Sequence, residues 1–431
     1  MLEKIFGLQA NKTNVRTELV AGVTTFLAMA YILAVNPLIL GNAGMDSGAV
    51  FVATCLSAAI GTYIMAFVAN LPIAQAPGMG MNAFFAFSVV LGMGYSWQAA
   101  LAGIFCSGIL FLILSFSGIR EKIITAIPHS LKIAVGVGIG FFIAFIGLKN
   151  AGIVVGNADT LVAFGDISNP QVLLALFGLV ITLLLMMLKQ RFAIFVGMVI
   201  TAIVGLVFGL SEMPTMIVSM PPSIAPTFGQ VFAGFSEILK PEFLLVIFAF
   251  LFVDFFDTAG TLMAVASRAG LMTKDGQIKN GSKAMVSDAL STTIGAVLGT
   301  SSVTSYVESM TGVEQGGRTG LTAATTATLF LVALFFSPIL VIFTSAVTAP
   351  ALIIVGGLMA ESVKEIDWID QPTAFAAFFT IIMMILTASI AQGIAFGFMA
   401  YVLLMAFSKR IKEVNPIMIG LFFVFILNFL L

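Results

Sequence analysis

The chain has 431 residues, of which 60% are hydrophobic and 9% are charged, and its 19 basic and 20 acidic residues leave a formal net charge of -1. This composition excludes a water-soluble domain, which carries about 25% charged residues, and the nearly neutral charge leaves no basic surface for nucleic acid. A spanning helix needs about 20 apolar residues, so the chain has room for roughly fourteen spans. We therefore expect an all-α polytopic membrane protein.

The N-terminal residues 1–19 are basic and have no small-residue cleavage site after a short apolar core, so no cleaved signal peptide is expected. Basic residues favour the cytoplasmic side of a membrane, and Lys4, Lys12 and Arg16 therefore predict a cytoplasmic N-terminus. In a fourteen-span count the basic residues of the later connections fall on the same side, with Lys149 and Lys240 the exceptions near span ends, which predicts a multi-pass protein of the cell membrane. These residues are Arg120, Lys122, Lys189, Arg191, Arg268, Lys274, Lys279, Lys283, Arg318, Lys364, Lys409, Arg410 and Lys412.

A short internal repeat links the second and ninth predicted spans. Residues 56–61 (LSAAIG) and 290–295 (LSTTIG) agree at four of six positions, and each copy lies just ahead of a broken apolar segment. Two halves of seven spans each would enter the membrane with opposite orientations. Such an inverted repeat is typical of transporters, whose binding site lies near the midplane where the broken segments meet.

The first broken segment is residues 71–82, LPIAQAPGMGMN. Pro72 and Pro77 remove backbone donors, and the two glycines loosen the chain, so a continuous helix is not expected. Asn82 then opens an apolar run, where it can cap a half-helix or contact a ligand. Irregular backbone at membrane depth is tolerated only where it is buried in protein or lines a cavity, so this break indicates a site.

Residues 252–262, FVDFFDTAGTL, place Asp254 and Asp257 inside the eighth predicted span. A charge in the membrane is costly and therefore indicates function, and a spacing of three puts both acids on one helical face. The alternative is an inward-facing pair that only joins helices. Asp288, at the start of the ninth span, is either a supporting acid or an interfacial acid near Lys283.

The second broken segment is residues 299–312, GTSSVTSYVESMTG, in which serine and threonine bond locally while valine and tyrosine favour extended chain. Ser309 is a candidate cap for a second half-helix. Two half-helices whose N-termini face one point present free N–H groups to a ligand. Glu308 lies at that point and, with Asp257, forms a pair of acids that can accept N–H groups from a planar heterocycle. The alternative for Glu308 is a loop acid at the cytoplasmic surface.

Four segments, RTELVAGVTTFLAMAYI, QAPGMGMNAFF, FVDFFDTAGTL and GTSSVTSYVESMTGVEQGGRTGLTA, resemble the purine-nucleobase permease (AzgA-like) branch of the nucleobase and ascorbate transporter superfamily. The resemblance covers residues 11 to about 412 and implies seven plus seven inverted spans, with short antiparallel strands in spans 3 and 10. It implies a core domain of residues 1–117 and 241–337 and a gate domain of residues 118–240 and 338–431. The last apolar stretch, 416–431, is short for a span and is expected to be interfacial or re-entrant.

Carried over by motif, the resemblance implies that Asp257 and Glu308 are the substrate-binding acids of spans 8 and 10. In related uracil and xanthine carriers a titratable residue stands at the position of Thr261, so their proton coupling does not transfer directly to this chain. The substrate-binding set that we expect is Asp257, Glu308, Asn82, Gly80 and Val307, and the supporting or proton-coupling set is Asp254, Thr261, Ser309 and Asp288.

The resemblance implies import of hypoxanthine, guanine or adenine with protons, by movement of the core past the gate, and a homodimer through the gate domains. Two nearby acids in a poorly solvated site favour proton uptake, so Asp257 or Glu308 is the expected proton carrier. With two cysteines and one histidine, no metal site is expected. A cofactor and an enzymatic activity are not expected either. An anion transporter on the same fold would require a positive or neutral site, and a channel would not accumulate substrate. An aspartyl protease is disfavoured because Asp254 and Asp257 are three apart on one helix and no GxGD motif is present.

Overall fold

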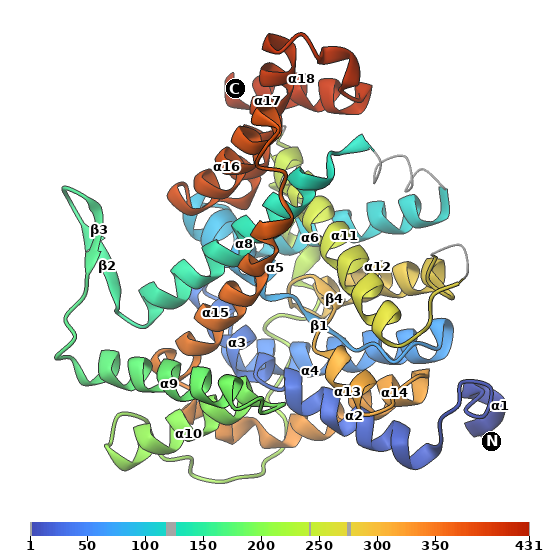
Figure 1. Ribbon diagram of the computed structural model, residues 1–431. Helices are drawn as coiled ribbons and strands as arrows, with labels where there is room; N and C mark the ends of the chain where they lie inside the picture. Colours follow the sequence, from blue (N-terminus) through green and yellow to red (C-terminus); the bar gives the residue numbers. More distant parts are fainter. Residues whose placement is uncertain (1, 118–125, 241–242, 274–276, 431) are drawn as a thin grey trace.

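The computed structural model describes residues 2–117, 126–240, 243–273 and 277–430, and most of these residues are helical (Figure 1). Within this part of the chain, nine helices are long and apolar enough to cross a membrane. Shorter apolar helices lie between them, which agrees with a multi-pass membrane protein. Three of the basic residues used above for the orientation, Arg120, Lys122 and Lys274, lie outside the described residues.

The first half of the chain runs through seven consecutive segments up to residue 207. Several of them are composite, because a proline, a π-helical turn or a strand interrupts the α-helix. In order they are α2 (Val15–Met29) with α3 (Ile32–Asn42), α4 (Ser47–Ile64) with η1 (Met65–Ala69), β1 (Gln75–Pro77) with α5 (Met79–Ala83) and η2 (Phe84–Gly92), α6 (Trp97–Ser117), α8 (His129–Asn150), α9 (Pro170–Met187) and α10 (Ala193–Val207).

The second half repeats this order of helices, one strand and a short helix, from residue 243 onward. Its segments are α11 (Phe243–Arg268), α12 (Gly281–Leu298), β4 (Val303–Ser305) with α13 (Ser309–Glu314), α14 (Gly320–Ala333) with η4 (Leu334–Ile342), α15 (Ser345–Ala360) with η5 (Glu361–Glu365), α16 (Gln371–Leu386) and α17 (Ile390–Phe407). Outside the two sets lie α1 (Leu2–Phe6), the hairpin of β2 (Val154–Asn157) and β3 (Leu161–Phe164), η3 (Gln230–Ser236), η6 (Ile411–Glu413) and α18 (Pro416–Leu430).

Polar residues in the connections start several of these helices. The Asp46 carboxylate accepts the backbone N–H of Ala49 at 2.7 Å and caps α4. Asn169 accepts the N–H of Gln171 at 2.9 Å and is followed by Pro170, whose missing N–H costs nothing in the first turn. Helices α4 and α9 therefore begin where the sequence supplies a side-chain acceptor for a free N–H group.

The two broken segments pair with each other at the centre of the molecule (Figure 1). Strands β1 and β4 are antiparallel, and Gln75 lies opposite Ser305. The backbone N–H of Gly78 donates to the carbonyl of Ser302 at 3.0 Å and extends the pairing by one bond. Each break thus supplies backbone partners to the other, which irregular chain at membrane depth requires. The predicted strands in spans 3 and 10 are confirmed.

The two copies of the internal repeat lie on helices that pack against each other, α4 and α12. A Cβ atom added to Gly61, in the first copy, would lie 2.6 Å from the Oγ of Ser291, in the second copy. A residue larger than glycine would therefore separate α4 from α12. The repeated sequences meet in space, as an inverted repeat around a shared axis requires.

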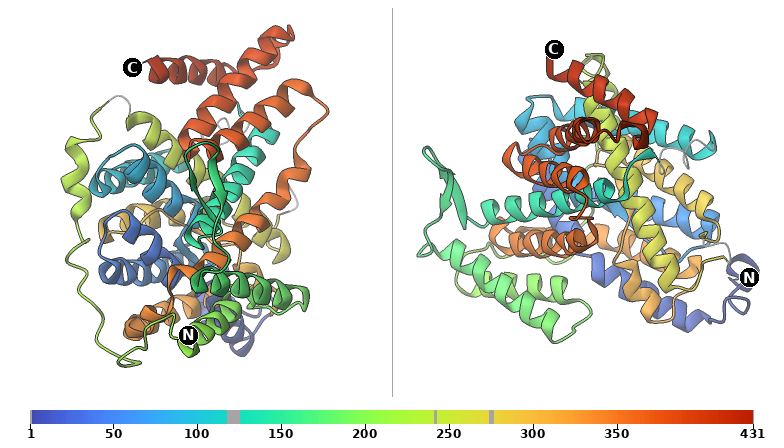
Figure 2. Two further views of the ribbon diagram at one scale, coloured as in Figure 1. Left: turned by 90° about the vertical axis from the view of Figure 1, so that its left-hand side faces the viewer. Right: turned by 45° about the horizontal axis from the view of Figure 1, so that its top comes forward.

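The helices fall into two packing groups, which Figures 1 and 2 show from three sides. Helix α8 packs against α15 and α16, α9 packs against α10 and α15, and α16 packs against α17. In the other group α14 packs against α2 and α4, and α12 packs against α4 and α6. The connection after α10 runs along the outside of the molecule to η3, which packs against α6 (Figure 2, left). The expected boundary at residues 337 and 338 falls inside η4.

Residues 416–430 form one helix, α18, which packs against α17. One side of α18 is buried, with Met418 fully covered and Phe425 nearly so, whereas Phe423 and Val424 are exposed. Leu431 lies outside the described residues. Whether α18 is interfacial or re-entrant stays a prediction.

Candidate functional site

Glu308 immediately precedes α13, where the chain leaves strand β4. The phenol of Tyr31 donates a hydrogen bond to Glu308 Oε1. Tyr31 lies at the interruption between α2 and α3, so the break in the first span brings its side chain to the break in the tenth. Glu308 is half-buried and hydrogen-bonded inside the protein, so the alternative of a cytoplasmic loop acid is wrong.

Asp257 lies on α11, which packs against α13. The carboxylates of Asp257 and Glu308 are close enough for their charges to interact. The Tyr306 phenol is close enough to interact electrostatically with both acids. The side chain of Asp257 is exposed, and that of Val307 is 44% exposed. Helix α11 and the β4–α13 break therefore hold two interacting acids, of which Asp257 is exposed and Glu308 is half-buried.

Asn82 is fully buried in α5, the short helix that follows β1. Its Oδ1 accepts a hydrogen bond from the hydroxyl of Ser301, whereas its Nδ2 has no partner among the described residues. The helix begins after Gly78, so the prediction that Asn82 caps the half-helix is wrong. A buried amide without a partner is costly, and a ligand acceptor is one group that would relieve that cost.

Gly80 lies where α5 approaches α8 of the other packing group. A Cβ atom at this position would lie 2.7 Å from Cγ2 of Ile139. That separation is too short for a real contact, so either Ile139 or the helix must move. The missing side chain of Gly80 therefore sets how closely α5 approaches α8, beside any contact with a substrate.

Gly80→Ala is expected to lower uptake of a transported substrate several-fold, because the new methyl group pushes α8 away from α5. Ile139→Ala in the same chain restores the space, and the double variant is expected to recover most of the lost rate. Uptake by the two single variants and the double variant measures this coupling. An unchanged defect in the double variant would show that Gly80 acts through the substrate and not through α8.

Asp288 is fully buried and lies in the second turn of α12. It accepts hydrogen bonds from Gln75 Nε2 at 3.0 Å, from Ser305 Oγ at 2.9 Å and from Thr258 Oγ1 at 2.7 Å. These donors come from β1, β4 and α11. The alternative of an interfacial acid near Lys283 is therefore wrong, because Asp288 joins the paired strands to the helix that carries Asp257.

Asp254 is 1% exposed on α11 and accepts a hydrogen bond from the Thr292 hydroxyl at 3.0 Å. Its other oxygen, Oδ1, has no partner among the described residues. Asp254 and Asp288 lie close enough for their charges to interact. The two acids thus form a second, fully buried pair behind Asp257.

Ser309 and Thr261 complete the predicted set. The Ser309 hydroxyl accepts the backbone N–H of Ala74 at 3.0 Å, next to β1, and makes no capping bond to α13. The expected cap is therefore wrong, and Ser309 joins the second broken segment to the first. Thr261 is half-buried on α11, one helical turn beyond Asp257.

Three polar residues that organise the site were not predicted from the sequence. For Tyr31 the only indication in the sequence was Pro37, which lies inside α3 and indicates that the first span is irregular. Gln75 accepts from Ser291 Oγ at 2.8 Å besides donating to Asp288. The sequence indicated Gln75 only as an amide side chain inside a broken segment that is otherwise apolar.

The third residue, Glu18, is fully buried in the first turn of α2. Its carboxylate accepts from the backbone N–H of Arg318 at 2.8 Å and of Thr322 at 3.1 Å, and from the hydroxyls of Thr319 at 2.9 Å and Thr322 at 2.6 Å. These donors surround the N-terminus of α14, where an acid is favoured. Glu18 therefore caps a helix of the opposite half of the chain.

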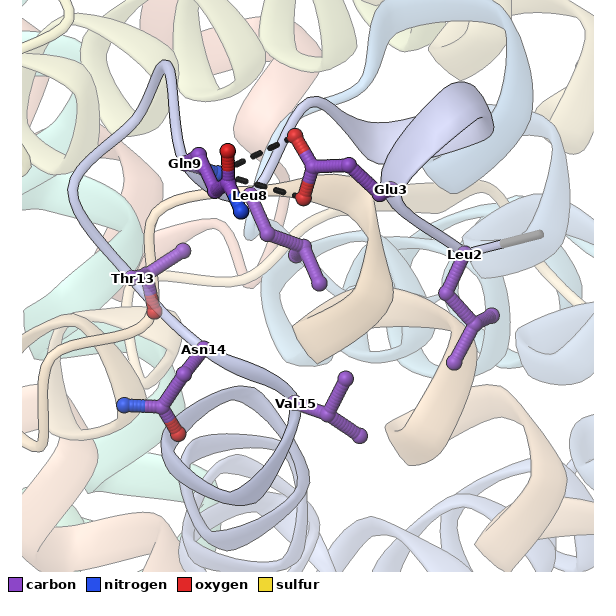
Figure 3. Close-up of a pocket in the computed structure, with 7 residues that line it drawn as sticks. All are labelled: Leu2, Glu3, Leu8, Gln9, Thr13, Asn14 and Val15. Atoms are coloured by element: carbon purple, nitrogen blue, oxygen red, sulfur yellow. Dashed lines mark hydrogen bonds between the residues drawn. The ribbon is translucent and has the colours of Figure 1, made fainter.

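A surface hollow of about 430 Å³ lies beside the N-terminal segment, at the periphery of the molecule (Figure 3). Its lining includes Leu8 and Glu3, whose carboxylate accepts the N–H of Gln9 at 3.2 Å. The hollow is open and is formed by residues 2–15 alone, so it is separate from the paired acids.

Residues 16–396 match the Permease family. The guanine/hypoxanthine permease PbuG of Bacillus subtilis (strain 168) is 53% identical over 427 residues, which cover 97% of this chain and 97% of that protein. The adenine permease AdeQ of Escherichia coli (strain K12) is 45% identical over 414 residues, which cover 96% of this chain and 93% of that protein. These relatives confirm the branch that the four sequence segments resemble.

The transmembrane domain of a cyanobacterium bicarbonate transporter, BicA, superposes with a TM-score of 0.64 at 18% sequence identity, covering 88% of this chain and 97% of that one. At this identity the likeness concerns the fold, and it confirms the predicted seven-plus-seven inverted repeat. Because the family match and the two full-length relatives agree, this chain belongs to the Permease family, among relatives that include guanine/hypoxanthine and adenine permeases.

Proposed function

We propose that this protein is a secondary active transporter that imports purine nucleobases, namely hypoxanthine, guanine and adenine, together with protons. The observation that carries the proposal is the pair Asp257 and Glu308, two interacting acids at the junction of α11 with the β4–α13 break. The relatives PbuG, a guanine/hypoxanthine permease, and AdeQ, an adenine permease, supply the substrate class.

A purine base is flat and carries N–H groups at its edges, so it fits acceptors that lie side by side. In this proposal Asp257 and Glu308 each accept an N–H group of the base, as ionised carboxylates do with up to four lone-pair positions. The Nδ2 of Asn82, which has no partner among the described residues, donates to a ring nitrogen or carbonyl of the base. Val307, which is exposed next to Glu308, covers a face of the base, and the backbone at Gly80 contacts its edge.

Charge balance supplies the coupling to protons. Asp254, Asp257, Asp288 and Glu308 lie within one region, and the donors around the buried acids Asp254 and Asp288 are hydroxyl and amide groups without charge. Binding a neutral base between ionised carboxylates leaves their charge uncompensated, whereas a proton reduces it. The acids are expected to titrate jointly, with Asp257 or Glu308 taking up the transported proton.

The two packing groups are the proposed moving parts. The core domain, residues 1–117 and 241–337, carries the acids, and the gate domain, residues 118–240 and 338–431, supplies the wall against which it slides. The contacts of α5 and α11 with α8 form part of the surface between them. An elevator-type movement of the core would expose the acids to each side of the membrane in turn. A homodimer held by the gate domains and a cytoplasmic N-terminus complete the proposal.

An anion transporter is the alternative that the fold of BicA brings forward. An anion would have to approach Asp257 and Glu308, whose charges repel it. The acids therefore favour a base with N–H donors over an anion. A channel is separated from a transporter by whether substrate accumulates.

Cells that lack their own purine permeases and express this chain are expected to accumulate radiolabelled hypoxanthine above the external concentration. Unlabelled guanine or adenine should compete and bicarbonate should not, across a series of pH values. A protonophore should abolish accumulation, because the proton gradient supplies the free energy. Equilibration without accumulation would indicate a channel, and accumulation that follows a sodium gradient would replace the proton by sodium.

A further inference from the structure

The first span contains an interruption at the depth of the paired strands. Helix α2 ends at Met29, α3 begins at Ile32, and the N–H of Leu33 bonds to the carbonyl of Ala30 at 3.1 Å instead of continuing the α-helical ladder. Pro37 inside α3 removes a further backbone donor. The interruption orients Tyr31, which is 1% exposed, toward the second broken segment.

The Tyr31 phenol donates to one oxygen of Glu308, the acid that precedes α13. Tyr31 itself is enclosed in the largest hydrophobic cluster, which draws residues from both halves of the described chain, so the direction of its hydroxyl is constrained. A carboxylate held by a buried donor loses rotational freedom, and one oxygen is occupied while the other stays available. The hydrogen bond from Tyr31 therefore fixes the orientation of Glu308 in addition to the backbone between β4 and α13.

We infer that Tyr31 is a positioning residue for substrate recognition: it holds Glu308 Oε1 so that the second carboxylate oxygen meets an N–H group of the purine base. This inference rests on the proposed function for the identity of the substrate. It assigns to the first span a part in recognition beside the two broken segments. Tyr31 acts through Glu308 and makes no contact with the base in this assignment.

The test removes only the hydroxyl, with Tyr31→Phe. The KM for hypoxanthine is expected to rise roughly ten-fold, because the free energy of one hydrogen bond to a charged group corresponds to a change of about that size. The maximal rate per transporter is expected to stay near the wild-type value. Tyr63→Phe is the matched control, because its hydroxyl bonds to Thr328 Oγ1 at 2.8 Å on another part of the core. The control is expected to keep the wild-type KM.

A double-variant cycle separates positioning from a general effect on folding. Guanine binding to the purified protein and its unfolding temperature without ligand are measured for wild type, Tyr31→Phe, Glu308→Gln and the double variant. Tyr31→Phe is expected to have little further effect once Glu308 is Gln, in both measurements. Equal effects of Tyr31→Phe in both backgrounds, or a wild-type KM for Tyr31→Phe, would overturn the inference.

The two proposals fail in different ways. If the wild-type protein binds no purine, the proposed function fails, whereas the unfolding temperatures still show whether Tyr31 and Glu308 are coupled. If purines bind and the cycle is additive, the proposed function stands and the positioning role of Tyr31 is wrong.

Discussion

Asp257→Asn and Glu308→Gln are each expected to abolish accumulation of radiolabelled hypoxanthine, with a loss of at least roughly thirty-fold in uptake rate. Each substitution keeps the size of the side chain and replaces a carboxylate oxygen by an amide donor. The new NH2 group faces an N–H donor of the base, and the amide cannot take up the transported proton. Uptake into cells, normalised to the amount of protein in the membrane, measures the effect.

Glu361→Gln is the matched control, because this acid is exposed and pairs with Lys364 at 2.6 Å on the surface. Such exposed pairs contribute little, so wild-type accumulation is expected. Normal uptake by a membrane-located Asp257→Asn or Glu308→Gln protein would remove that residue from the substrate site. Loss of accumulation with retained exchange of substrate would instead assign the residue to proton coupling.

Glu18→Ala is expected to lower the apparent unfolding temperature of the purified protein by several degrees. The substitution leaves the backbone donors of Arg318 and Thr322 without the acceptor that now satisfies them at the start of α14. Each buried donor left unpaired costs about 1–3 kcal/mol, so the total effect exceeds that of an ordinary surface substitution. Thermal unfolding in detergent provides the measurement.

Glu18→Gln keeps one amide oxygen as an acceptor and is expected to lie between the alanine variant and wild type. Glu365→Ala, in the connection after α15, serves as the control for loss of an acid. If Glu18→Ala unfolds at the wild-type temperature, then water replaces the lost acceptor and α14 does not depend on α2 for its cap.

The position of the broken segments could be predicted from local sequence, whereas their chemistry could not. Pro72, Pro77 and the neighbouring glycines together disfavour a continuous helix through their effect on the local backbone, so the break in the third span could be predicted from the chain itself. The helix start could not be assigned in the same way. Asn82 and Ser309 are both good capping residues, yet neither caps its helix. Asn82 accepts a hydrogen bond from the Ser301 hydroxyl, and Ser309 accepts one from the backbone N–H of Ala74.

The environment of the acid Asp288 could not be predicted from local sequence either. From sequence it lies five residues after Lys283, a spacing that fits an acid at the membrane surface. In the structure three donors from β1, β4 and α11 satisfy it in the interior. No window of sequence contains these donors, because they lie between 17 and 213 residues away along the chain.

The sequence alone determined that this chain spans a membrane many times, in two inverted halves with one broken segment in each, because apolar run length, proline, glycine and intramembrane acids act locally. Only the tertiary structure decided which groups meet those acids: the Tyr31 phenol on Glu308, the Gln75 amide on Asp288 and the Glu18 carboxylate at the start of α14. The physical reason is that a buried polar group takes its partner from whatever chain packing brings within about 3 Å, and in this fold the partners come from distant spans.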